Sequence, residues 1–180
     1  MMHTIRVSRV LRETVNTPYS DLVTRATGAA VRTSIRATIA ARPGSTAVLD
    51  FSEIGLVDFS CADEVVAKLL MDAPDNAFVI LGGLREDHSE AIDHVLCHHD
   101  LAVVTQESPG SAPRVLGQLA PDHREVLLLL YHRSSADVES CASALNWPIE
   151  RACAALDALL RRRLVRGDAA GLNFFPLALP

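Results

Sequence analysis

The stretch LDFSEIGLVDFSCADEVVAKLL, residues 49–70, joins a strand to a helix and decides the fold. Its first part belongs to a nearly continuous apolar run, AVLDF at 47–51, which is typical of a strand covered on both faces. A short crossing follows, and Ser60 and Asp63 stand in the first turn of the helix. The apolar stripe of that helix is formed by Val65, Val66, Leu69 and Leu70. A strand, a crossing and a helix in this order indicate an α/β fold.

The first hundred residues repeat this alternation. Further strands are expected at 5–10, 78–83 and 101–105, and further helices at 22–41 and 87–99. Because strands separated by helices pair in parallel, the pattern predicts a layered α/β sheet.

Composition limits the class of protein. The chain has 180 residues, 49% of them hydrophobic, which is ample for packed cores. No apolar run reaches the roughly 20 residues of a membrane span, and the N-terminus lacks the apolar stretch of a signal peptide, so a cytoplasmic protein is expected. The net charge of −5 argues against coating nucleic acid through bulk charge and leaves room for a local basic patch. The cysteines form no CxxC pair, which favours reduced thiols over disulfides.

The chain is expected to form two domains. The stretch ESPGSAPR, residues 107–114, holds two prolines, a glycine and two serines and reads as a linker between domains at 1–106 and 115–180. Residues 1–114 carry 10 Lys+Arg and 15 Asp+Glu, a charge of −5, whereas residues 115–180 carry 7 of each and are neutral.

The second domain is expected to be a small α+β fold of three helices and a hairpin. Helices are predicted at 120–132, 135–146 and 147–165, and a hairpin at 164–177 around a DAAG turn. Ser135 is the expected N-cap of the second helix. The buried stripe of the third helix is predicted to comprise Ile149, Cys153, Leu156 and Leu160.

Residues 20–105 resemble a known signalling fold. TRATGAAVRTSI at 24–35 and LDFSEIGLVDFSCADE at 49–64 are similar to a STAS-like family of unknown function, and the element order is similar to the STAS domain of anti-sigma factor antagonists. In the antagonists a serine at this turn is phosphorylated by a partner kinase that is also an anti-sigma factor, and phosphorylation breaks the complex. By position, Ser60 matches that serine and Asp58 the family's aspartate, while Phe59 and Cys61 replace its serine and glycine.

Two roles for Ser60 stay open. As an N-cap it would accept a hydrogen bond from a backbone N–H and form a capping-box-like pair with Asp63. As a phosphorylation site it would place about two negative charges at a helix start, beside Asp58, Asp63 and Glu64.

Three arginines share one face of the helix predicted at 22–41. Arg25, Arg32 and Arg36 are separated by seven and four residues and could bind phosphate or an acidic partner. The alternative is a solvated face with salt bridges to carboxylates such as Glu53. Gly28, near that face, would permit a close backbone approach.

No metal, cofactor or catalytic site is expected. His94 and His98 have the spacing of two metal ligands on a helix, but no third ligand can be named, and both fall on the face predicted to be solvated. No Gly-rich phosphate loop or G-x-S-x-G motif is present. Asp63 and Glu64 are adjacent and would diverge by about 100° on a helix. The sequence therefore predicts a protein that is not an enzyme.

The second domain resembles a winged helix-turn-helix over residues 115–178, most closely at ALNWPIERACAALDALLRRRLVRGD. The resemblance implies that the third helix enters the DNA major groove and that the hairpin contacts the backbone. Its exposed face would then carry Glu150, Arg151, Ala154 and Ala155, with Arg151 as the one strong base-reading donor. The expected phosphate contacts are Arg161, Arg162, Arg163 and Arg166.

Together these resemblances predict a bacterial regulator in which the STAS-like domain controls binding of the winged helix to duplex DNA. A homodimer would be one way to set the spacing of two DNA-reading helices. The alternative is a scaffold of a partner-switching pathway, whose STAS-like half binds a kinase or anti-sigma-like protein and whose winged helix binds protein.

Overall fold

The computed structural model describes residues 1–179, and within them it divides the chain into two compact units. The first unit comprises residues 1–118 together with Leu179, and the second comprises residues 119–178. The predicted linker, 107–114, lies inside the first unit, because the strand that follows it pairs with the main sheet. Along residues 1–179, no helix is both long enough and apolar enough to cross a membrane.

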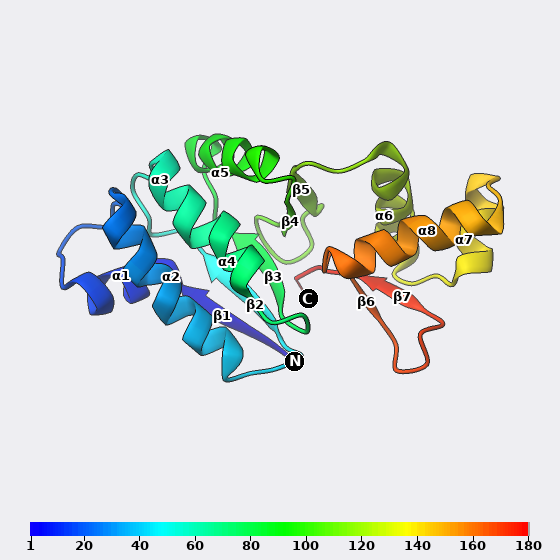
Figure 1. Cartoon of the computed structure of the whole chain (residues 1–180), viewed down its shortest axis with the longest axis horizontal. Helices are drawn as coiled ribbons and strands as arrows, with labels where there is room; N and C mark the ends of the chain where they lie inside the picture. Colours follow the sequence, from blue (N-terminus) through cyan, green and yellow to red (C-terminus); the bar gives the residue numbers. More distant parts are fainter. Residues whose placement is uncertain (180) are drawn as a thin grey trace. The chain divides into compact units, whose positions relative to one another are not determined.

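The first unit contains a five-stranded sheet with the strands in chain order (Figure 1). Its strands are β1 (Met2–Arg6), β2 (Thr46–Asp50), β3 (Phe78–Gly82), β4 (Ala102–Thr105) and β5 (Arg114–Gly117). The pairs from β1 to β4 are parallel, as predicted. The sequence did not indicate β5, which pairs antiparallel with β4 and forms one edge. The sheet is therefore mixed.

Helices connect the parallel strands. They are α1 (Val7–Val15), α2 (Arg25–Ala40), α3 (Phe59–Ala62), the π-helical turn η1 (Asp63–Lys68), α4 (Leu69–Asp72) and α5 (Glu86–His98). The strand predicted at 5–10 is wrong beyond Arg6, because Val7 and Leu11, four residues apart, bury one face of α1. α3, η1 and α4 form one continuous run, in which η1 widens the helix by local π geometry.

The core of the first unit lies between the sheet and these helices. Ala47 and Leu49 of β2 face the same side as their partners Val79 and Leu81 of β3. The same core cluster takes in helix residues from α2, η1 and α5, including Ile35, Val65 and Ile92. Because each crossover in such a chain-ordered parallel sheet is right-handed, the helices collect on one face. Figure 1 shows α2 and the run from α3 to α4 in front of the strands.

The second unit has three helices and a hairpin. Its elements are α6 (Pro121–Arg133), α7 (Val138–Leu145), α8 (Ile149–Arg161), β6 (Val165–Gly167) and β7 (Phe174–Pro176). Asp137 caps α7 by accepting from the backbone N–H of Ser140, so the predicted cap at Ser135 is wrong. Ala136, between α6 and α7, bridges to Phe174 and adds a short third edge to the hairpin.

The buried face of α8 differs from the predicted stripe. Ile149 is 54% exposed and Leu160 is 38% exposed, although both were expected in the core. The residues that α8 buries are Ala152, Ala155, Leu156 and Leu159. Ala155, predicted on the exposed face, is only 2% exposed. Small alanines let α8 pack closely on α6 and α7, and a pattern that weights large apolar residues does not find them.

Candidate functional site

Asp58, not Ser60, is the N-cap of α3. Its Oδ1 accepts from the backbone N–H of Cys61 at 2.7 Å, and its Oδ2 accepts from the backbone N–H of Thr24 at 3.0 Å. One carboxylate thereby joins the starts of α3 and α2. The prediction that Ser60 caps the helix is wrong, because the chain enters helical geometry at Phe59, two residues after the crossing ends at Val57.

Ser60 lies in the first turn of α3 and is half-buried. Its hydroxyl donates to Asp58 Oδ1 at 2.8 Å, so Asp58 receives three hydrogen bonds in all. A phosphate on the Ser60 oxygen would replace this donor with negative charge beside an existing carboxylate. Phosphorylation of Ser60 would therefore act directly on Asp58, the residue that joins the starts of α2 and α3. Phosphorylation itself stays a prediction.

The two helices approach closely at Gly28. A Cβ atom on Gly28 would lie 2.9 Å from Glu64 Cβ and 3.1 Å from Cys61 Cα, so α2 could not pack there with a larger residue. Cys61 donates its thiol hydrogen to the carbonyl of Thr24, with sulfur and oxygen 3.0 Å apart. Burial, together with nearby Asp58, raises the pKa of the Cys61 thiol to about 12 and keeps it protonated. Thr24 itself has φ +73°, a backbone conformation that carries strain.

The arginines of α2 pair with carboxylates of the run from η1 to α4. Arg25 Nη1 contacts Asp63 Oδ2 at 2.8 Å and Glu64 Oε1 at 3.0 Å. Arg32 lies between Glu64 and Asp72, and Arg36 Nη1 is 4.0 Å from Asp72. The salt-bridge alternative therefore describes all three side chains.

The prediction that Glu53 pairs with the arginines of α2 is wrong. It pairs instead with Arg12 at 3.4 Å and accepts from Ser8 Oγ at 2.7 Å. Asp63 and Glu64 were expected to diverge, yet both reach the same nitrogen of Arg25. Both also pair with Lys68, the last residue of η1.

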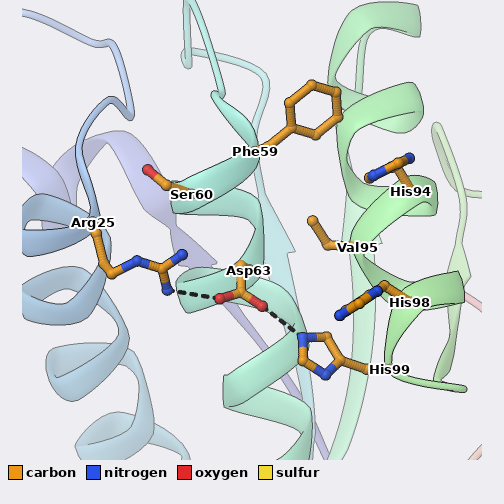
Figure 2. Close-up of a pocket in the computed structure, with 8 residues that line it drawn as sticks. All are labelled: Arg25, Phe59, Ser60, Asp63, His94, Val95, His98 and His99. Carbon is orange, nitrogen blue, oxygen red and sulfur yellow. Dashed lines mark hydrogen bonds and ion pairs between the residues drawn. The ribbon is translucent and has the colours of Figure 1, made fainter.

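His99 is the main residue of this site that the sequence did not single out. Its Nε2 lies 2.7 Å from Asp63 Oδ1, on the side of the carboxylate opposite Arg25 (Figure 2). Asp63 is therefore held between α2 and the end of α5. In the sequence, the only indication of His99 was its place next to His98. The four-residue spacing on a helix selected His94 and His98 instead.

The carboxylates of the site remain ionised at neutral pH. Burial raises the pKa of Asp63, but hydrogen bonds from Arg25 and His99 bring this pKa below its ordinary value of 3.8. Burial likewise raises the pKa of Glu64, while contacts from Lys68 and Arg25 lower it below 4.5. The pKa of Asp58 is also lowered overall, because the backbone N–H groups of Cys61 and Thr24 outweigh its burial.

His94 and His98 lie on the exposed face of α5, whereas His88, in its first turn, is fully buried. His94 and His98 are exposed while Val95 and Leu96 are buried, as predicted. Within residues 1–179, no group of three or more His, Cys, Asp or Glu side chains is placed to hold a metal ion. All four cysteines are free thiols.

Arg151 in the second unit is paired with other side chains of that unit. Its Nε and Nη2 contact the two carboxylate oxygens of Asp122 at 2.8 and 2.7 Å. The guanidinium also lies over the Trp147 ring, 4.0 Å from its centroid. The fork that would read a guanine is thus already engaged. Arg161 is exposed, and Arg162, Arg163 and Arg166 are half-buried near the end of α8 and in the hairpin.

Asp58→Ala is expected to destabilise the first unit more than Ser60→Ala. Loss of the cap and of the Thr24 contact should lower the free energy of unfolding by about 2 kcal/mol. Loss of the Ser60 hydroxyl removes one partly solvated hydrogen bond, worth about 0.5–1 kcal/mol. Urea unfolding followed by circular dichroism measures both values, and a larger loss for Ser60→Ala would show that Ser60 is the cap.

The unfolding free energy is expected to fall in acid. A carboxylate whose pKa is lower in the folded chain stabilises it above the unfolded value, and this contribution disappears as pH falls through the folded value. For Asp58, Asp63 and Glu64 the loss should therefore begin as pH drops below about 4.5 and continue below 3.8. Thermal unfolding between pH 6 and 2.5 tests this, and Asp63→Asn should flatten the curve. A melting temperature constant across that range would contradict it.

These contacts form an interlocked polar site at the start of α2 and along α3, η1 and α5. Both oxygens of Asp63 are engaged, Oδ2 by Arg25 and Oδ1 by His99. Comparisons of the chain with protein-family models and with curated proteins find no match.

Proposed function

We propose that the chain is a non-enzymatic regulatory protein whose first unit receives a signal at the Asp58–Ser60 junction and whose second unit binds duplex DNA as a winged helix. The observation that carries the proposal is the order of elements in the second unit. A helix is followed by a bridging residue, two further helices and an antiparallel hairpin, and Ala136 joins that hairpin at Phe174. This order is the one in which winged helices present their third helix and wing to DNA.

The basic end of the second unit supplies the phosphate contacts in this proposal. Arg161 is the last residue of α8, Arg162 is its C-cap, Arg163 follows, and Arg166 lies in β6. Phosphate contacts of this kind provide most non-specific affinity. Because Asp122 holds Arg151, we assign Arg151 to the support of α8 in the free protein, and base reading by it requires that pair to open.

A STAS-like role for the first unit is supported by two features. One is a mixed sheet, with β1 to β4 parallel and β5 antiparallel, whose core cluster joins the sheet to the helices that connect its strands. The other is Ser60 at a helix start, bonded to the aspartate that joins α2 to α3. A phosphate or an acidic partner at this point would compete for Arg25 and repel Asp58, and so alter how α2 packs.

The proposal is tested by capture of genomic DNA. Full-length protein is mixed with sheared DNA at about 0.15 M salt with excess competitor, because phosphate contacts weaken steeply with salt. The test variant is Arg161→Ala/Arg162→Ala, and the matched control is Arg9→Ala/Arg42→Ala, which removes the same charge from the first unit. Enrichment of a few fragments by the wild type and the control, but not by the test variant, is expected. No enrichment by folded wild type would overturn DNA binding.

A protein-binding second unit is the other candidate. Two observations favour it: the Arg151–Asp122 pair, and the exposed apolar side chains Ile149 and Leu128 on α8 and α6. Under this reading the chain is a scaffold of a partner-switching pathway. Capture of a kinase or anti-sigma-like protein that Ile149→Asp abolishes, without any enrichment of DNA, would support it.

A further inference from the structure

A pocket of about 490 Å³ lies between the run from α3 to η1 and the second half of α5. Figure 2 shows Arg25 on one wall, Phe59 and His94 at one end, and His98 and His99 at the other. Ser60, Asp63 and Val95 complete the lining. A pocket of this volume is within the range that holds small ligands.

The polar groups of the pocket are mainly hydrogen-bond donors. The one carboxylate, Asp63, already has Arg25 on Oδ2 and His99 on Oδ1. Because Asp63 is ionised, His99 must donate from Nε2 in that contact. Among the hydrogen bonds within residues 1–179, Arg25 uses Nη1 alone, so its Nε and Nη2 remain to face a ligand. The imidazoles of His94 and His98 are exposed at the rim.

The charges at and beside the pocket balance one another. The linked groups comprise four cations, Arg25, Arg32, Arg36 and Lys68, and three carboxylates, Asp63, Glu64 and Asp72. Asp58, which accepts from the pocket residue Ser60, adds a fourth carboxylate. An anion in the pocket would therefore be held by directed hydrogen bonds from Arg25 and not by a net charge.

The pocket also offers apolar surface. Phe59 is 56% exposed, and its ring centroid lies 5.0 Å from that of His94. Val95 is buried below them. A ligand with an aromatic or apolar part would cover Phe59 while its anionic group reached Arg25.

We infer that this pocket binds a small organic anion, in which a phosphate or carboxylate group contacts Arg25 and His98 and an aromatic or apolar part packs on Phe59. The inference deepens the proposed function and rests on its premise that the first unit receives a signal. Binding of the anion would draw the Arg25 guanidinium away from Asp63 and Glu64, next to Ser60. The binding itself can be measured without DNA.

Calorimetric titration with three small probes tests the inference on the full chain. Phenyl phosphate and benzoate carry the two anionic groups, and benzyl alcohol carries the same ring without charge. One or both anions are expected to bind at least tenfold more tightly than benzyl alcohol, and the stronger of the two identifies the group. Inorganic phosphate alone should bind more weakly than phenyl phosphate if Phe59 contributes.

Two variants locate the binding. Arg25→Gln and His98→Gln are each expected to weaken the better anion at least fivefold, and Arg9→Gln, which removes an exposed arginine paired with Glu13, should leave it unchanged. His98 is exposed, so its variant keeps the test valid if Arg25→Gln unfolds the protein. Equal affinity for anions and benzyl alcohol, or full binding by the His98 variant, would overturn the inference. DNA capture by the same samples shows separately whether the proposed function holds.

Discussion

Replacement of Glu64 by glutamine is expected to lower the free energy of unfolding by about 2–4 kcal/mol. The Glu64 side chain is 4% exposed and contacts Arg25, Arg32 and Lys68. Glutamine keeps the shape but removes the charge, and the three cations then face one another with less compensation. The loss in free energy of unfolding stays below that for unpairing a fully buried charge, because the three cations are partly exposed and can bind water.

Urea unfolding of Glu64→Gln should be compared with that of Glu13→Gln. Glu13 also pairs with an arginine, but both partners are exposed, so its loss should cost less than about 0.5 kcal/mol. Trp147, the only tryptophan, lies in the second unit, so its fluorescence follows that unit while circular dichroism follows both. Equal unfolding curves for the two variants would show that Glu64 does not hold the helices together.

Gly28→Val is expected to cost about 2–3 kcal/mol, because it forces side-chain atoms into the contact between α2 and the start of η1. The first added atom alone would meet Glu64 Cβ at 2.9 Å and Cys61 Cα at 3.1 Å. Neither is the flexible end of a side chain, so the helices themselves must separate. Separation would also lengthen the contacts of Arg25 with Asp63 and Glu64.

Ala26→Val is the matched control for Gly28→Val. Ala26 is exposed on the same helix, so valine there should cost only its lower helix propensity, about 0.5 kcal/mol. Urea unfolding of both variants gives the comparison. A Gly28 variant as stable as the Ala26 variant would mean that α2 and η1 are not in close contact at this position.

Strong periodic patterns predicted most of the first unit. The apolar runs of β2, β3 and β4 and the stripe of α5 were found within a few residues of their observed bounds. Gly28 was expected at a close approach, and it lies at one. β5 could not be found, since RVLG is short and follows a segment rich in Pro, Gly and Ser. β5 is a strand because it pairs with β4 at the edge of the sheet, and a local sequence pattern does not encode that pairing.

The candidate site was predicted in part. Asp58 and Ser60 were selected, but the cap was assigned to Ser60 instead of Asp58, because a cap is decided by where helical geometry begins. The carboxylate partners of Arg25 and Arg32 depend on how α2 lies against η1, and His99 depends on where α5 ends. In the second unit, Asp122 and Arg151 are 29 residues apart and meet only in the folded unit.

The central claim is that the Asp58–Ser60 junction controls DNA binding, and the most direct test is the affinity of Ser60 variants for a captured DNA fragment. Wild type, Ser60→Ala and Ser60→Asp are titrated as full-length proteins, with circular dichroism to confirm folding. We expect Ser60→Asp, which sets a second carboxylate against Asp58, to change the dissociation constant at least fivefold, and Ser60→Ala to leave it within twofold. Identical dissociation constants for all three proteins would contradict the claim.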